Sequence, residues 1–164
     1  MSFVVLTEPL MSSLDTFSIR ILSELQRDAR QTIQQIAQKV GLTSTPCWKR
    51  VKDMESKGVI KGYTALVDRD KVGLMNCVLV EINLTGHSEK TVTDFEREVA
   101  ACPQITECYS TTGTADYILK VITTDIKSYD AMLNTVLFRL PGVAHVRSSI
   151  VLREVKYDPR MPLL

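Results

Sequence analysis

The chain has 164 residues, of which 45% are hydrophobic and 24% charged, a composition that excludes disordered and fibrous proteins. Its net charge of +1 identifies no partner, but the charge is unevenly distributed: residues 1–63 hold nine basic and six acidic side chains, and residues 64–164 hold eleven and thirteen. This asymmetry predicts two modules with different partners. No apolar run reaches the roughly 20 residues that span a bilayer. The start also lacks the basic and apolar regions of a signal peptide, so we expect a cytoplasmic protein without a membrane partner, and residues 1–12 as a flexible extension.

The cysteines and histidines indicate neither a metal site nor a cofactor. Metal-binding cysteines usually occur as C-x-x-C pairs or beside histidines, and this chain has neither arrangement. The residues in question are Cys47, Cys77, Cys102, Cys108, His87 and His145. We therefore expect free thiols in a reducing compartment.

The first module is expected to be a winged helix-turn-helix over residues 13–62. Apolar residues recur at spacings of three and four from Leu14 onward, which predicts a first helix. A second helix over about 32–40 ends at Gly41, and a third opens within residues 43–46, capped by Thr43 or Thr45, and ends at Gly58. A β-prone stretch over 59–67 favours the winged variant, and residues 63–73 are assigned to a linker strand and the domain boundary.

The second module, residues 74–156, alternates strand and helix patterns. Apolar residues alternate over 78–84, a helical stripe includes Phe95, and two strands over 105–112 and 117–123 flank a hairpin. A helix over 126–140 and a long strand over 143–155 follow, and residues 157–164 form a tail. The order β-α-β-β-α-β predicts a ferredoxin-like sheet and an α+β protein. Cys77 and Leu79 point outward from the first strand, which suggests a subunit interface on the open face of the sheet.

The third helix carries the candidate DNA-binding surface. In a helix-turn-helix the second helix of the pair enters the major groove of double-stranded DNA. Hydroxyls at its start and basic side chains along it suit phosphates and guanine edges. The exposed positions are Ser44, Thr45, Lys49, Arg50, Lys52 and Lys57. Trp48 has three interpretations, beneath the wing, against DNA sugars or in the core, and its spacing from Val51 favours the core.

The hairpin from Gly113 to Asp116 is the second candidate site. Backbone N–H groups in a turn of small residues suit a carboxylate, and Asp116 suits an ammonium, so together they describe a site for a free amino acid. The same residues are also ordinary hairpin chemistry.

Three stretches resemble the leucine-responsive regulatory protein/AsnC family of transcription regulators: ILSELQRDAR from Ile21, VGLTSTPCWKRV from Val40 and GTADYILK from Gly113. The resemblance implies a DNA-binding domain followed by an amino-acid-sensing domain, in homodimers that assemble into octamers or related rings. It implies effector contacts from one subunit at Gly113, Thr114 and Asp116, and from the facing strand of a neighbour at Ser149, Ile150 and Val151. It implies DNA contacts at Ser44, Thr45, Pro46, Lys49 and Arg50.

One departure bears on the effector. Many relatives have Gly-Asp-x-Asp where this chain has Thr114 in place of the first aspartate, which disfavours a cationic effector and favours leucine or methionine. Two alternatives remain open: an architectural DNA-organising protein without an effector response, and a small enzyme. Against the enzyme, the chain has no Gly-rich phosphate loop, no H-E-x-x-H and no G-x-S-x-G motif.

Overall fold

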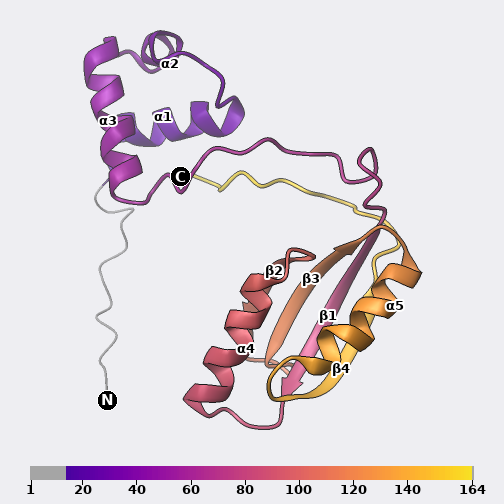
Figure 1. The fold of residues 1–164 in the computed structure, drawn as a ribbon. Helices are drawn as coiled ribbons and strands as arrows, with labels where there is room; N and C mark the ends of the chain where they lie inside the picture. The colour runs from indigo at the N-terminus through magenta and orange to yellow at the C-terminus, as the bar shows by residue number, and fades with distance from the viewer. Residues whose placement is uncertain (1–13, 164) are drawn as a thin grey trace. The chain divides into compact units, whose positions relative to one another are not determined.

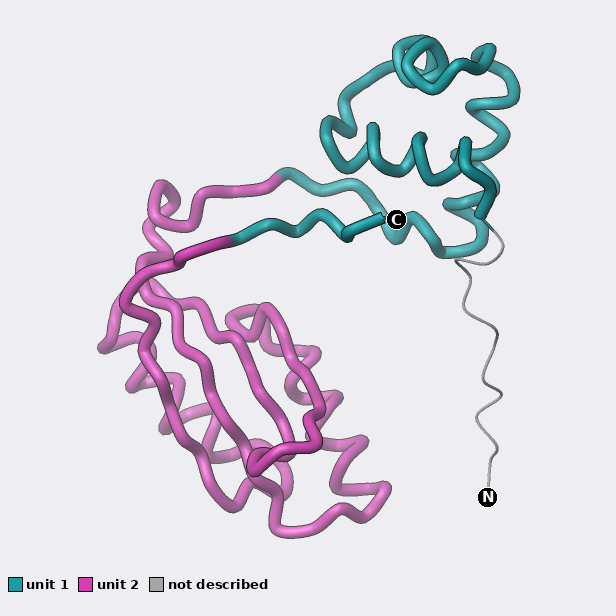
Figure 2. The backbone as a smooth tube through the Cα atoms, turned by 180° about the vertical axis from the view of Figure 1, so that it is seen from behind, with its two compact units in different colours: residues 1–65, 157–164 teal, residues 66–156 magenta. Residues whose placement is uncertain are grey.

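The computed structural model describes residues 14–163, so the extension expected over residues 1–12 lies outside the described part. The described chain forms two compact units (Figures 1 and 2). One contains residues up to Ala65 together with those from Tyr157 onward, and the other contains Leu66–Lys156. No helix in residues 14–163 is long and apolar enough to cross a membrane.

The first unit contains three helices, α1 (Thr16–Arg27), α2 (Ile33–Val40) and α3 (Ser44–Ser56). Asp15 caps α1 through the Ser18 N–H, and Thr32 forms a capping box on α2 with Gln35. The inward faces share one core made of Ile21, Leu22, Ile36, Ala37, Val40, Cys47, Val51 and Met54. The arrangement confirms the predicted helical pair and its supporting helix.

Between α2 and α3, Gly41 has a φ of 80°, a left-handed conformation that glycine adopts without strain. Thr43, not Thr45, is the N-cap of α3.

The β-prone stretch over 59–67 contains no strand. The prediction of β structure there is wrong for the single chain. A strand requires a hydrogen-bonding neighbour, and this stretch pairs with none in the described residues. Val59 and Ile60 instead pack against the helical core.

The tail after residue 156 belongs to the first unit. The side-chain amide of Gln26 on α1 accepts from the Met161 N–H at 2.6 Å and donates to the Met161 carbonyl at 3.1 Å. Leu163 packs against the helical core. The chain therefore passes between the two units twice, and the first unit is built from two segments that are far apart in the sequence.

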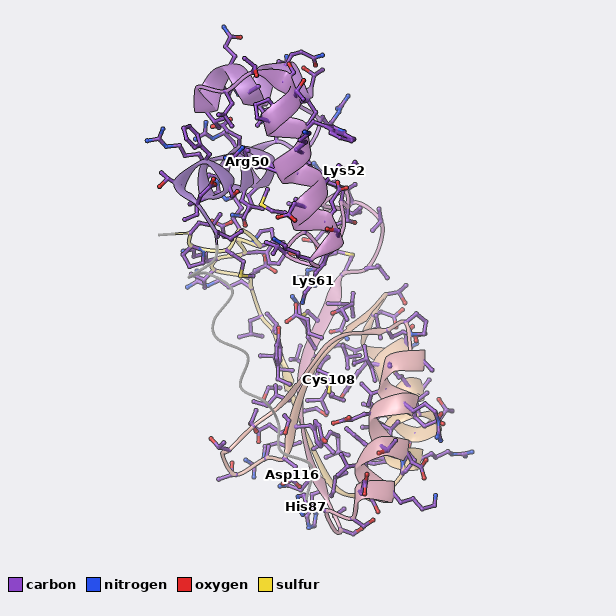
Figure 3. All side chains as sticks on the ribbon, turned by 90° about the vertical axis from the view of Figure 1, so that its left-hand side faces the viewer. Arg50, Lys52, Lys61, His87, Cys108 and Asp116 are labelled. Carbon is purple, nitrogen blue, oxygen red and sulfur yellow. The ribbon has the colours of Figure 1, made fainter. Side chains whose placement is uncertain are left out.

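The second unit is a four-stranded antiparallel sheet with helices on one face (Figures 1 and 3). Its elements, in chain order, are β1 (Asn76–Leu84), α4 (Glu89–Ala101), β2 (Ile105–Ser110), β3 (Tyr117–Thr123), α5 (Ile126–Thr135) and β4 (Val143–Ile150), and the strand order is β2-β3-β1-β4. This confirms the predicted ferredoxin-like α+β architecture.

Alternation along β1 fills the core beneath the helices. Val78, Val80 and Ile82 are fully buried and pack with Phe95 of α4 and Leu119 of β3. The intervening residues of β1 lie on the opposite, open face of the sheet. Leu79 on that face is 43% exposed, as the sequence predicts. Cys77 lies on the same face, also as predicted, and is buried within the single chain.

The helix expected over 126–140 and the strand expected over 143–155 both end several residues early. The helix from Ile126 stops at Thr135 and continues after Val136 as a short 3-10 helix, Leu137–Arg139. The strand expected over 143–155 ends at Ile150, opposite Val78. Because β1 begins only two residues earlier, at Asn76, the chain beyond Ile150 has almost no strand to pair with.

Candidate DNA-binding and effector-binding sites

Helix α3 presents an exposed face opposite the core. Cys47, Val51 and Met54 point inward, and the exposed set, Thr45, Trp48, Lys49 and Lys52, recurs at spacings of three and four. Lys49 has no hydrogen bond or ion pair within residues 14–163, while Lys52 pairs with Glu55 at 2.7 Å on the same helix. Ser44 and Pro46 are half-buried at the helix start. This face suits the phosphates and groove edges of DNA.

Among the α-helices in residues 14–163, only α3 has no side-chain cap at its N-terminus. Asp15, Thr32, Ser88 and Asp125 cap the other four helices, whereas the Thr43 side chain forms no such bond. The first-turn N–H groups of α3 are therefore available to an external acceptor, and phosphate is the acceptor that a helix N-terminus favours.

Trp48 lies on this exposed face, with 50% of its surface accessible. The prediction that it fills the core is therefore wrong. The inward positions at the correct helical spacing are already taken by Cys47, Val51 and Met54, which leaves Trp48 beside the core rather than in it.

Arg50 is held by α1 (Figure 3). Its guanidinium donates to the Asp15 carboxylate at 2.9 and 3.2 Å and lies 5.7 Å from the centre of the Phe17 ring. The Arg50 hydrogen bond and the Ser18 N–H lower the pKa of Asp15 to about 2. Arg50 therefore joins α3 to the cap of α1, and Lys49 and Lys52 remain the basic groups directed outward.

Asp15→Asn tests this junction. Asparagine keeps the N-cap but loses the ion pair, and because the pair is partly exposed we expect a loss of at most about 1 kcal/mol at neutral pH. The pKa of Asp15 in the folded protein is depressed, so its contribution is present above the ordinary value of 3.8 and is lost as the pH falls toward 2. In urea unfolding monitored by Trp48 fluorescence, the parent should therefore lose more stability than the variant between pH 4 and 2. Identical pH profiles for parent and variant contradict the assignment.

The hairpin between β2 and β3 is fixed to the end of β1. The Asp116 N–H donates to the Ile82 carbonyl at 2.9 Å, and the Asn83 side chain donates to the Thr114 carbonyl at 2.7 Å. The Asp116 carboxylate accepts from the Leu84 N–H at 2.8 Å and lies 2.9 Å from Nε2 of His87 (Figure 3). These contacts, the Leu84 N–H first, lower the pKa of Asp116. The carboxylate chosen from the sequence thus already contacts two donors.

Beside this hairpin, the open face of the sheet contains a hollow of about 270 Å³. It is lined by Glu81, Asn83, Thr114, His145, Val146 and Arg147. Glu81 and Arg147 face each other across β1 and β4, with Nη1 and Oε2 3.4 Å apart. Glu81, Arg147 and His87 were not predicted from the sequence. In the sequence, Glu81 and Arg147 look like ordinary strand residues and His87 like an ordinary loop residue. The register that pairs Glu81 with Arg147 exists only in the folded sheet.

The remaining predicted effector residues lie elsewhere. Ser149 and Ile150 pair with Leu79 and Val78, and the Val151 N–H donates to the Cys77 carbonyl at 2.9 Å. These positions are near the start of β1, whereas the hairpin is at its end. One chain therefore does not bring the two sets together.

A helix-turn-helix with an uncapped, basic α3, followed by a ferredoxin-like unit with a polar hollow, defines a DNA-binding regulator with a ligand-binding domain. Residues 14–61 match the winged helix-turn-helix DNA-binding domain, and residues 77–161 match the Lrp/AsnC ligand binding domain. The chain belongs to the Lrp/AsnC family of transcription regulators.

Known proteins of similar sequence and structure match nearly the whole chain. The leucine-responsive regulatory protein of Haemophilus influenzae is 40% identical over 144 residues, which are 88% of this chain and 87% of that protein. The structure of an AsnC family regulator from Agrobacterium tumefaciens matches with a TM-score of 0.86 and 35% identity, covering 92% of this chain and 97% of the other. That of a Neisseria meningitidis regulator in complex with L-methionine matches with a TM-score of 0.85 and 30% identity, with the same coverage. These relatives are regulators rather than enzymes.

Proposed function

We propose that this regulator binds its DNA sites through the exposed face of α3 and changes its DNA affinity when free leucine or methionine binds to the second unit. One observation carries the proposal: this chain, a member of the family, combines an outward basic helix with a separate ligand-binding unit. A similar regulator binds L-methionine and another is leucine-responsive, which favours an apolar amino acid here. The protein acts in the cytoplasm, where its DNA is.

The DNA contacts in this proposal are Ser44, Thr45, Lys49 and Lys52. The hydroxyls and free N–H groups at the start of α3 bind phosphate, and the two lysines bind phosphates or guanine edges. Pro46 shapes the first turn, and Arg50 orients α3 through Asp15.

The effector binds at the hairpin that contains Gly113, Thr114 and Asp116, and a neighbouring subunit contributes Ser149, Ile150 and Val151. Because one chain holds these two sets at opposite ends of β1, the complete site requires a second subunit. The open face of the sheet, with Leu79 43% and Tyr109 57% exposed, is the surface on which we expect homodimers to form, and dimers to build octamers or related rings.

Thermal unfolding with added amino acids tests the sensing function. A ligand that binds only the folded state stabilises it, by about 2.7 kcal/mol at a hundred times its Kd. We expect L-leucine or L-methionine at millimolar concentration to raise Tm, and D-leucine, the stereochemical control, to leave it unchanged. If no free amino acid changes Tm, sensing is excluded and an architectural DNA-binding role is favoured.

A further inference from the structure

We propose that Glu81 and Arg147 bind the two charged ends of the amino-acid effector, Glu81 its α-ammonium and Arg147 its α-carboxylate, in the hollow on the open face of the sheet. This inference rests on the proposed sensing function and names the groups that perform the recognition.

Glu81 and Arg147 form a loosely joined pair of opposite charges. They are paired in the β1–β4 register, but a single contact of 3.4 Å joins them, at the long limit for a hydrogen bond. The Arg147 side chain is 77% exposed and has no other partner in residues 14–163, so most of its five N–H donors remain available. A guanidinium matches a carboxylate with two parallel hydrogen bonds, and a carboxylate accepts readily from an ammonium.

Asp116 is the competing carboxylate, and its contacts are structural. One oxygen accepts from the Leu84 N–H and the other lies 2.9 Å from Nε2 of His87, so Asp116 fastens the hairpin to the end of β1 and to the segment after it. Glu81, by contrast, contacts only Arg147 within the described residues. Glu81 is therefore the one carboxylate in the lining of the hollow, and most of its acceptor positions are unused.

The remaining lining of the hollow suits the shared backbone of amino acids. Asn83 is turned toward Thr114, whose carbonyl it binds, and Val146 is the one aliphatic residue of the lining. A volume of about 270 Å³ is just below the roughly 300–1,000 Å³ of pockets for drug-sized ligands. The hollow thus recognises the zwitterion, while the subunit that covers this face selects the side chain.

The test uses the full-length protein and calorimetric titration with L-leucine and L-methionine. Two probes each lack one charged group: 4-methylpentanoate has no ammonium and 3-methylbutylamine has no carboxylate. We expect the parent to bind an amino acid and neither probe. Glu81→Gln and Arg147→Gln should each weaken that binding about ten- to a hundredfold, because each removes one partner of a charged hydrogen bond.

Glu107→Gln is the matched control. Glu107 forms a cross-strand ion pair with Lys120 on the same sheet, at 2.9 Å in the β2–β3 register, but outside the hollow. It should bind the effector like the parent. Arg147→Lys keeps the positive charge but loses the paired N–H donors, so it should bind the effector with intermediate affinity. This variant also tests the inference if a glutamine variant folds poorly.

The outcomes separate this inference from the function on which it rests. If the parent binds an amino acid and Glu81→Gln, Arg147→Gln and Glu107→Gln all bind equally well, the charge-pair inference is overturned and sensing stands. If the parent binds no free amino acid, both are overturned. Selective loss in the variants of the hollow, with folding and DNA binding retained, supports the inference.

Discussion

Lys49→Ala combined with Lys52→Ala should abolish most of the DNA affinity of this regulator. Each lysine that contacts a phosphate releases counterions on binding, so the double variant should reduce the slope of log affinity against log salt by about two. We expect a loss on the order of tenfold for each lysine. Lys49 should matter more, because it has no partner in residues 14–163 and Lys52 already pairs with Glu55.

Lys57→Ala is the control for that double variant. It removes one positive charge, as each of the two substitutions does singly, from the C-cap of α3, where Lys57 pairs with Asp53 at 2.8 Å, far from the uncapped helix start. Fluorescence anisotropy with a labelled duplex over a range of salt concentrations measures both affinity and slope. If the lysine variants at positions 49 and 52 bind like the parent, the exposed face of α3 is not the DNA-binding surface.

Phe95→Ala should destabilise the second unit by about 3–5 kcal/mol, the range for removing a fully buried phenylalanine. Phe95 has no exposed surface, and its ring centre lies 4.6 Å from that of Tyr117. Tyr117 directly follows Asp116, and its hydroxyl donates to Glu96 at 2.9 Å on α4. The cavity would therefore loosen α4 and the hairpin that precedes Tyr117 as well as the core.

Phe138→Ala provides the comparison, since Phe138 lies in the same unit but is 55% exposed. Its removal should change stability by no more than about 0.5 kcal/mol, as for ordinary surface positions. Urea unfolding followed by far-ultraviolet circular dichroism gives both free energies of unfolding. A loss below about 1 kcal/mol for Phe95→Ala would mean that the core beneath the sheet repacks or is not formed as described.

Local patterns predicted the architecture well because most elements carry their own signal. Alternation at Val78, Val80 and Ile82 identified β1 and its buried face, and Gly41 marked the turn between α2 and α3. The errors occur where a partner decides the structure. The chain after Ile150 is not a strand because β1 has almost ended, and residues 59–67 have β propensity but find no neighbouring strand in the described part of the chain.

The candidate sites show the same difference between features set by local sequence and features set by distant partners. The hairpin at Gly113 and the outward lysines of α3 were predicted from local sequence, since turn chemistry and helical spacing are local. The roles of Arg50 and Glu81 depend on Asp15 and Arg147, which are 35 and 66 residues away. Such pairings follow from helix packing and strand register, and no short pattern encodes them.

The most direct measurement is DNA binding by fluorescence anisotropy, with a labelled fragment from upstream of the protein's own gene and an unrelated fragment. Both are titrated with and without L-leucine or L-methionine at several salt concentrations. We predict preferential binding to the first fragment and a shift in its affinity with one amino acid, and by linkage the DNA should change the affinity for that amino acid by the same factor. Equal binding to both fragments, unaffected by either amino acid, would contradict an effector-responsive regulator and favour an architectural protein.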